Sequence, residues 1–182
     1  VLYISQLAKE QGIKVLLSGA GGDDLFTRYR RHYALQFERY WNWLPYRVRL
    51  AIEEISHKLN TKQSFQRRIT KLFNGAGLDN NERLINYFRW TSDSLLQSLY
   101  SQEFRELLGN SDSNSPMKDF IAPLSSNTSQ LDLMLSLEQR FFLTDHNLNY
   151  TDKMSMAASV EVRVPFLDVD LVDFVSCIPN RY

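Results

Sequence analysis

The chain has 182 residues, with 21 basic and 21 acidic side chains, so its formal net charge is zero. This balance gives no reason to expect a nucleic acid or a membrane surface as partner. One cysteine, Cys177, excludes an internal disulfide framework and fits a reducing compartment, and no apolar run approaches the ~18 residues of a membrane helix. We therefore expect a cytoplasmic protein, long enough to bury a core of its own.

The glycines are few and unevenly placed. With only 7 glycines and 5 prolines, the composition favours long helices and few turns. Four of the 7 glycines nevertheless lie between Gly12 and Gly22. The sequence starts at Val1 inside an amphipathic pattern, so we expect it to be a piece of a longer polypeptide.

The N-terminal part predicts a helix, a strand, a loop and a second helix. Apolar residues at helical spacing cover Leu2–Ala8, and Gly12 is a natural helix stop. The short, mostly apolar run Ile13–Leu17 is typical of a buried strand in a parallel sheet. Ser18–Asp24 follows as a loop, and Leu25–Trp41 predicts a helix rich in aromatic and basic side chains.

The middle of the chain predicts further helices. Apolar stripes at helical spacing cover Tyr46–Leu59, Phe65–Phe73, Asn81–Trp90 and Gln102–Leu108. The polar stretch Asn110–Pro116 predicts a mobile loop.

The last third predicts three helices and one extended segment. Ser129–Phe142 has a helical pattern, and Thr144–Asp145 is typical of a cap that starts a second helix over His146–Ala158. Apolar and charged residues alternate over Val160–Val164, which predicts an extended segment, and Val169–Cys177 predicts a final helix.

The first motif with chemical content is Leu16–Phe26, in which the end of the predicted strand runs into a glycine loop and then a helix. A glycine loop between strand and helix presents backbone N–H groups to phosphates. Asp23 and Asp24 fall in the first helical turn, where the dipole favours carboxylates, and beside a phosphate they suggest a divalent cation or a ligand ammonium group. The alternative is a tight turn whose aspartates only cap the helix. The motif fits neither the P-loop nor the dinucleotide-binding fingerprint.

The second motif is Asp152–Ala157, preceded by Asp145 on the same predicted helix face. Lys153 is a point charge suited to a phosphate or a pyrophosphate. The alternative, a surface lysine on a methionine-rich core helix, is favoured when the motif is taken alone.

The third motif is Glu161–Asp168, in which Glu161 and Arg163 share one face of a strand expected to be buried. They pair with each other or with Asp152, and a structural ion pair that orients a loop is the favoured interpretation. No metal-ligand spacing exists. We interpret one cluster of basic and aromatic residues as a solvated helix face rather than an anion site; its members are Arg28, Tyr29, Arg30, Arg31 and Tyr33. We expect the three histidines to be surface or packing residues; these are His32, His57 and His146.

Taken together, Val15–Phe26, Asp152–Ala157 and Glu161–Asp168 resemble the synthetase domain of glutamine-hydrolysing asparagine synthetases. The β-lactam synthetases share this domain. The resemblance implies an α/β parent domain of the adenine nucleotide α-hydrolase-like type, with a parallel sheet. Residues 1–182 would form its C-terminal portion, predominantly α-helical with one or two short strands.

The resemblance also implies a chemistry. ATP and Mg²⁺ would activate a carboxylate, aspartate in the type enzymes, as an acyl-adenylate, and ammonia from glutamine would then attack it. Catalytic roles would fall to Lys153, which holds the departing pyrophosphate, and Asp23, which recognises the substrate's ammonium end or lies near the metal. The nucleotide and acyl-adenylate would be bordered by the remaining residues of the loop, Ser18, Gly19, Ala20, Gly21, Gly22 and Asp24.

Three departures from the family pattern leave alternatives open. Ala20 stands where asparagine synthetases often carry an acidic residue, which leaves open the identity of the substrate and the handling of ammonia, so an amidotransferase for another carboxylate stays an alternative. Thr27–Arg28 stands where the family often has Gly-Gly. The family's ATP loop, of the form S-G-G-x-D-S, and the glutaminase domain do not occur in the sequence. We therefore expect this fragment to be inactive alone, and a non-catalytic helical module is the competing hypothesis. Association into a homo-oligomer is also expected, because an isolated strand leaves unpaired edges.

Overall fold

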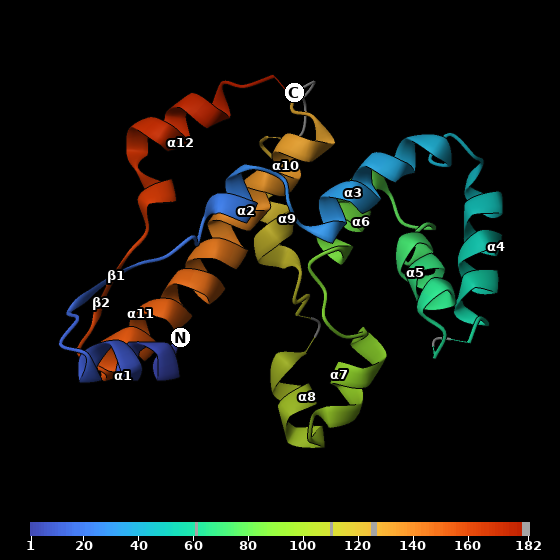
Figure 1. Cartoon of the computed structure of the whole chain (residues 1–182). Coiled ribbons are helices and arrows are strands. Elements are labelled where there is room, and N and C mark those ends of the chain that lie inside the picture. Colours follow the sequence, from blue (N-terminus) through green and yellow to red (C-terminus); the bar gives the residue numbers. More distant parts are fainter. Residues whose placement is uncertain (61, 110, 125–126, 180–182) are drawn as a thin grey trace. The chain divides into compact units, whose positions relative to one another are not determined.

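A computed structural model describes residues 1–60, 62–109, 111–124 and 127–179 (Figure 1). Helices dominate the described residues and accompany one small parallel sheet, which confirms the predicted fold class. The chain divides into two compact units. Unit 1 comprises Val1–His32 and Leu131–Tyr182, and unit 2 comprises Tyr33–Gln130. No helix in the described ranges is long and apolar enough to cross a membrane.

Unit 1 carries all three sequence motifs. In chain order its elements are α1 (Leu2–Glu10), β1 (Val15–Leu17), α2 (Gly22–Leu25), the start of α3 (Arg30–Phe37), α10 (Gln130–Leu137), the π-helix η2 (Glu138–Leu148), α11 (Asn149–Ala157), β2 (Glu161–Arg163), the 3-10 helix η3 (Pro165–Leu167) and α12 (Val169–Ser176).

Both strands of unit 1 start directly after a helix that ends in the same way. After α1, Gly12 adopts a φ of 73°, and the N–H groups of Gly12 and Ile13 donate back to the helix. After α11, Ser159 adopts a φ of 61°, and Ser159 and Val160 make the equivalent pair of bonds. This is the Schellman motif, in which a left-handed residue stops the helix and redirects the chain.

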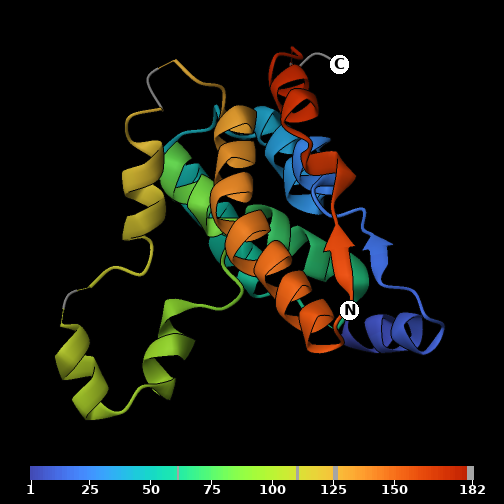
Figure 2. The ribbon, with the colours of Figure 1, turned by 90° about the vertical axis from the view of Figure 1, so that its left-hand side faces the viewer.

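The two strands pair in parallel, with Val15 opposite Glu161 and Leu17 opposite Arg163. Figure 2 shows the two arrows side by side and pointing the same way. The extended segment predicted at Val160–Val164 is therefore confirmed. The expectation that β1 is buried is wrong, because Leu17 is 75% exposed and the strand pairs only with β2 within the described residues.

Two predicted helix boundaries differ from the structure. The helical run from α10 through η2 to α11 is continuous, so the predicted cap at Thr144–Asp145 is wrong. The Thr144 hydroxyl donates to the carbonyl of Arg140 one turn earlier, and this bond keeps Thr144 inside a helix. The helix predicted over Leu25–Trp41 is broken instead at Thr27, whose φ of 58° is incompatible with a right-handed helix.

Unit 2 is built from short helices. Its elements are the rest of α3, the 3-10 helix η1 (Glu38–Tyr40), α4 (Tyr46–His57), α5 (Ser64–Phe73), α6 (Asn80–Asn86), α7 (Asp93–Leu99), α8 (Gln102–Leu108) and α9 (Ser115–Ile121). The sequence did not predict α7 or α9. Helix α9 begins inside the loop predicted at Asn110–Pro116, of which Asn110 lies outside the described residues.

Polar side chains fix the turns and the interior of unit 2. The Glu53 carboxylate accepts the backbone N–H groups of Gly75 (2.6 Å) and Gly77 (2.9 Å), and so joins α4 to the turn after α5. The buried Arg83 guanidinium pairs with Glu38 at 2.8 Å. These bonds satisfy groups that would be costly to bury alone.

Candidate functional site

The glycine loop starts at the carboxyl end of β1 and leads into α2. The Ser18 N–H donates to the carbonyl of Arg163 at 2.8 Å, which continues the pairing of the strands by one step. The Ala20 N–H donates to Ser18 Oγ at 3.2 Å and closes a tight turn. A Cβ at Gly19 would have nothing within 4 Å, so the tip of the loop is open. This arrangement leaves the backbone around Gly19 accessible to a ligand.

Gly21 is required by the backbone and by its neighbour. Its φ of 87° lies in the left-handed region, and a Cβ there would lie only 2.9 Å from Leu167 Cγ. The adjacent turn packs similarly, because the rings of Phe26 and Phe166 meet edge to face at 6.2 Å. Leu167 and Phe166 belong to the third sequence motif. The structure therefore brings the first and third motifs into direct contact.

The two adjacent aspartates face different environments. Asp23 is exposed, with its carboxylate 3.9 Å from the Arg28 guanidinium. Asp24 is 1% exposed, and one of its oxygens accepts the Tyr29 hydroxyl at 3.2 Å. Asp23 is therefore available to a ligand, whereas Asp24 belongs to the interior of unit 1.

The second motif lies on α11, the helix that leads into β2. Asp152 and Lys153 are both exposed there. Asp145 lies in the π-helix, 4.0 Å from the Arg140 guanidinium. Glu161 and Arg163 pair with each other at 2.8 Å, one of the two pairings expected, on an exposed face of β2. This hydrogen bond raises the pKa of Arg163 above its already high value.

Behind the loop lies a buried cluster of charged groups that sequence reasoning missed. The Glu138 carboxylate, at the first position of the π-helix, is fully buried and accepts from Arg31 and from His32, whose Nε2 lies 2.8 Å away. The Arg31 guanidinium stacks on the rings of Tyr29 (4.3 Å) and Phe142 (4.5 Å).

This cluster corrects the expectation of a solvated basic face. Arg28 and Arg30 are exposed, but the Arg31 side chain is only 16% exposed and His32 only 1%. A signal was present in the sequence, because Glu138 falls one residue after Leu137, on the apolar stripe of a strongly apolar helix. A carboxylate on such a stripe needs a buried partner.

Burial in and beside this cluster shifts the pKa values of Asp24 and Tyr29. Burial raises the pKa of Asp24, the negative charge of Glu138 adds to this rise, and the Tyr29 hydrogen bond opposes it. Burial and the neighbouring Asp24 raise the pKa of Tyr29 to about 12, so Tyr29 is a hydrogen-bond donor at neutral pH.

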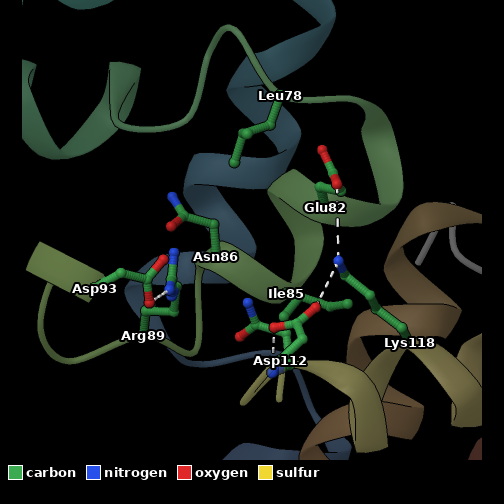
Figure 3. A pocket seen from close by; sticks show the side chains of 9 residues that line it. Leu78, Glu82, Ile85, Asn86, Arg89, Asp93, Asp112 and Lys118 are labelled. Atoms are coloured by element: carbon green, nitrogen blue, oxygen red, sulfur yellow. Dashed lines mark hydrogen bonds and ion pairs between the residues drawn. The ribbon is translucent and has the colours of Figure 1, made fainter. Parts of the chain in front are cut away.

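The described residues hold no group of three or more histidine, cysteine or acidic side chains placed to bind a metal ion. A small pocket of about 280 Å³ lies in unit 2, between α6 and α9 (Figure 3). Its charged side chains already pair with one another, because Lys118 Nζ lies 2.9 Å from Asp112 Oδ2 and 3.8 Å from Glu82 Oε1. The predicted site residues do not line this pocket.

Comparison with known proteins gives a consistent result. Curated proteins from Mycobacterium bovis and from two strains of Mycobacterium tuberculosis, each described as "Putative asparagine synthetase, glutamine-hydrolyzing", are 28% identical to this chain over 185 aligned positions. The alignment covers 98% of the chain but only 26% of each relative, so the chain spans about a quarter of their length. No solved structure matches significantly. The family model for asparagine synthase matches residues 1–182 throughout, and the chain therefore belongs to the asparagine synthase family.

Proposed function

We propose that this chain is part of an ATP-dependent amidotransferase that adenylates a carboxylate and converts it to an amide with ammonia from glutamine. Membership of the asparagine synthase family supports this class of reaction. The observation that carries the proposal is the contact of the glycine loop with the third motif at Gly21 and Leu167. Residues far apart in the sequence thereby form one surface at the carboxyl ends of parallel strands, the edge where α/β folds bind ligands.

The reaction has two steps. A carboxylate oxygen of the substrate attacks the α-phosphorus of ATP, an acyl–phosphate bond forms, and pyrophosphate leaves. The nitrogen of ammonia then attacks the acyl carbon, the bond to the adenylate oxygen breaks, and AMP leaves with the amide formed. The first step brings two anions together, so cationic and dipolar groups must offset their repulsion.

The residues of unit 1 are suited to particular parts of this task. The backbone of Ser18–Gly22, which is open at Gly19, would border the nucleotide and the acyl-adenylate, with Asp24 anchoring the loop from inside. Exposed Asp23 would bind a substrate ammonium group, and exposed Lys153 would hold the departing pyrophosphate. Mg²⁺ would arrive with ATP, because the described side chains supply no complete set of ligands for it.

Ala20 favours a second candidate, an amidotransferase of the same class that acts on a carboxylate other than aspartate. Its methyl side chain is half-buried in the turn and brings no charge to the loop. A substrate with a second charged group would need such a charge for its recognition. Aspartate and the alternative carboxylates therefore have to be compared directly.

The test is carboxylate-dependent exchange between ATP and labelled pyrophosphate, measured on the full-length protein. Exchange with aspartate supports the first candidate, and exchange only with other carboxylates supports the second. We expect Lys153→Ala to abolish exchange and Lys58→Ala, which removes another exposed lysine, to leave it unchanged. If no carboxylate supports exchange, the chain is a non-catalytic module and the proposal is wrong.

A further inference from the structure

The buried cluster behind the glycine loop is a continuous series of contacts that leads from the π-helix to the loop. It starts at Glu138 in the π-helix, passes to the Arg31 guanidinium, continues through the stacked Tyr29 ring, and ends at Asp24 in α2. Asp24 lies three residues after Gly21, and α2 packs against the π-helix that carries Glu138. Charged and polar groups thereby tie the glycine loop to the π-helix.

Stability alone does not account for this arrangement. Removing an ion pair from water costs about as much as the pair regains, so a buried pair adds little net stability over apolar packing. A pair of this kind does, however, fix a single geometry, because only one arrangement satisfies both charges. Arg31 is constrained further, since its planar guanidinium is stacked on Tyr29 and Phe142 while it bonds to Glu138.

Not all buried polar atoms of the cluster have a hydrogen-bond partner among the described residues. Asp24 Oδ1, His32 Nδ1 and Glu138 Oε2 are buried, and no hydrogen bond is found for them among the described residues. A buried polar atom without a bond is costly, so the bonds that Glu138 accepts from Arg31 and His32 are the ones that satisfy the charged groups of the cluster.

We propose that Glu138 is a positioning residue, which acts through Arg31, Tyr29 and Asp24 to fix the glycine loop in the conformation that binds its ligand. The catalytic consequence of this role rests on the proposed function. The effect of Glu138 on the conformation of the loop does not depend on the reaction. Glu138 itself touches no substrate. Its contribution is to restrict the backbone of Ser18–Phe26.

Unit 2 offers a matched control for the loss of a buried charge. Arg83 and Glu38 form a pair at 2.8 Å with side chains that are 2% and 8% exposed. Glu38→Gln therefore removes a buried carboxylate charge from an arginine in the same way as Glu138→Gln, but in the other unit. If losing any buried carboxylate charge loosens the whole chain, the two variants should behave alike.

The experiment measures amide hydrogen exchange in peptides covering residues 18–26 of the full-length protein. We expect exchange to become at least tenfold faster in Glu138→Gln, to be partly restored in Glu138→Asp, and to stay within twofold of wild type in Glu38→Gln. If Glu138→Gln does not fold, Arg31→Lys makes the same test, because it keeps the charge but loses the stacked fork. Unchanged protection of residues 18–26 in a folded variant would overturn the proposal.

Kinetics separates this inference from the proposed function. If wild type catalyses ATP–pyrophosphate exchange, Glu138→Gln should lower kcat/KM at least tenfold at a temperature where it is fully folded, whereas Glu38→Gln should not. An equal kcat/KM in Glu138→Gln and Glu38→Gln contradicts the positioning role but not the proposed function. Absence of exchange in wild type contradicts the proposed function, and the hydrogen-exchange result then still decides the role of Glu138.

Discussion

Substituting Gly21 by alanine tests the contact between the glycine loop and the third motif. Its φ of 87° costs an L-residue about 1–2 kcal/mol. The added Cβ would lie 2.9 Å from Leu167 Cγ, and overpacking of this kind costs about 1–3 kcal/mol. The lower entropy of the unfolded alanine chain offsets about 0.4–1 kcal/mol. We expect Gly21→Ala to destabilise unit 1 by about 2–4 kcal/mol.

The two causes separate in a double-mutant cycle with Leu167→Ala. That change removes the atoms that collide with the new Cβ but leaves the backbone strain at position 21. Leu167 is half-buried, so Leu167→Ala alone should cost less than the ~2–5 kcal/mol of a fully buried leucine. The loss of unfolding free energy in the double mutant should be smaller than the sum of the losses in the two single mutants by about 1–3 kcal/mol.

The measurement is urea unfolding followed by circular dichroism. Tryptophan fluorescence is unsuitable, because Trp41, Trp43 and Trp90 all lie in unit 2. Gly19→Ala is the matched control, since its φ is not positive and its Cβ would meet nothing within 4 Å; it should change stability by less than about 0.5 kcal/mol. Additive effects of the Gly21 and Leu167 substitutions would refute the close approach of the two motifs.

Three further predictions concern the elements that support the site. Ser159→Gly should raise stability by about 0.5–1 kcal/mol in urea unfolding, because glycine relieves the positive φ at the end of α11. Glu53→Gln should cost about 1–3 kcal/mol in the same assay, since an amide can accept only one of the bonds from Gly75 and Gly77 with its oxygen. The raised pKa of Asp24 means that its protonated form favours folding, so this contribution is lost as the pH rises above the ordinary value of 3.8. Asp24→Asn should therefore gain thermal stability relative to wild type between pH 4 and pH 7, and an unchanged difference in Tm across that range would contradict the burial of this carboxylate.

The sequence contained what was needed for local structure and for the motifs. Periodicity located α1, α4, α5 and α8 closely, because each has a clear apolar stripe and a natural stop. It missed α7, although Ser92 supplies a cap whose hydroxyl accepts the Leu95 N–H at 3.3 Å. The cap at Ser92 was the local signal that could have indicated this helix.

The position of Glu138 indicated a buried partner, but the identity of that partner, Arg31, could not be predicted from the sequence. Residue type predicts solvent exposure for arginine, histidine and glutamate, and nothing local distinguishes Arg31 from Arg28 or Arg30. The distinction comes from Glu138, more than a hundred positions later in the chain, because its carboxylate offsets the free-energy cost of burying the Arg31 guanidinium. Pairings over that distance are set by tertiary packing rather than by local pattern.

The helix ends before the two strands explain how separate motifs come to share one surface. The turns at Gly12 and Ser159 send the chain into β1 and β2, which pair with Val15 opposite Glu161, so that Ser18 and Val164 follow the two strands at the same edge of the sheet. From Ser159 back to Lys153, α11 rises roughly 9 Å, while the chain from Ser159 forward to Arg163 rises roughly 13 Å. Because α11 packs against β2 and the chain reverses at Ser159, the helix and the strand run alongside each other (Figure 2). The family resemblance assigns Lys153 and the glycine loop to one site in the proposed function, and the Lys153→Ala variant tests that assignment.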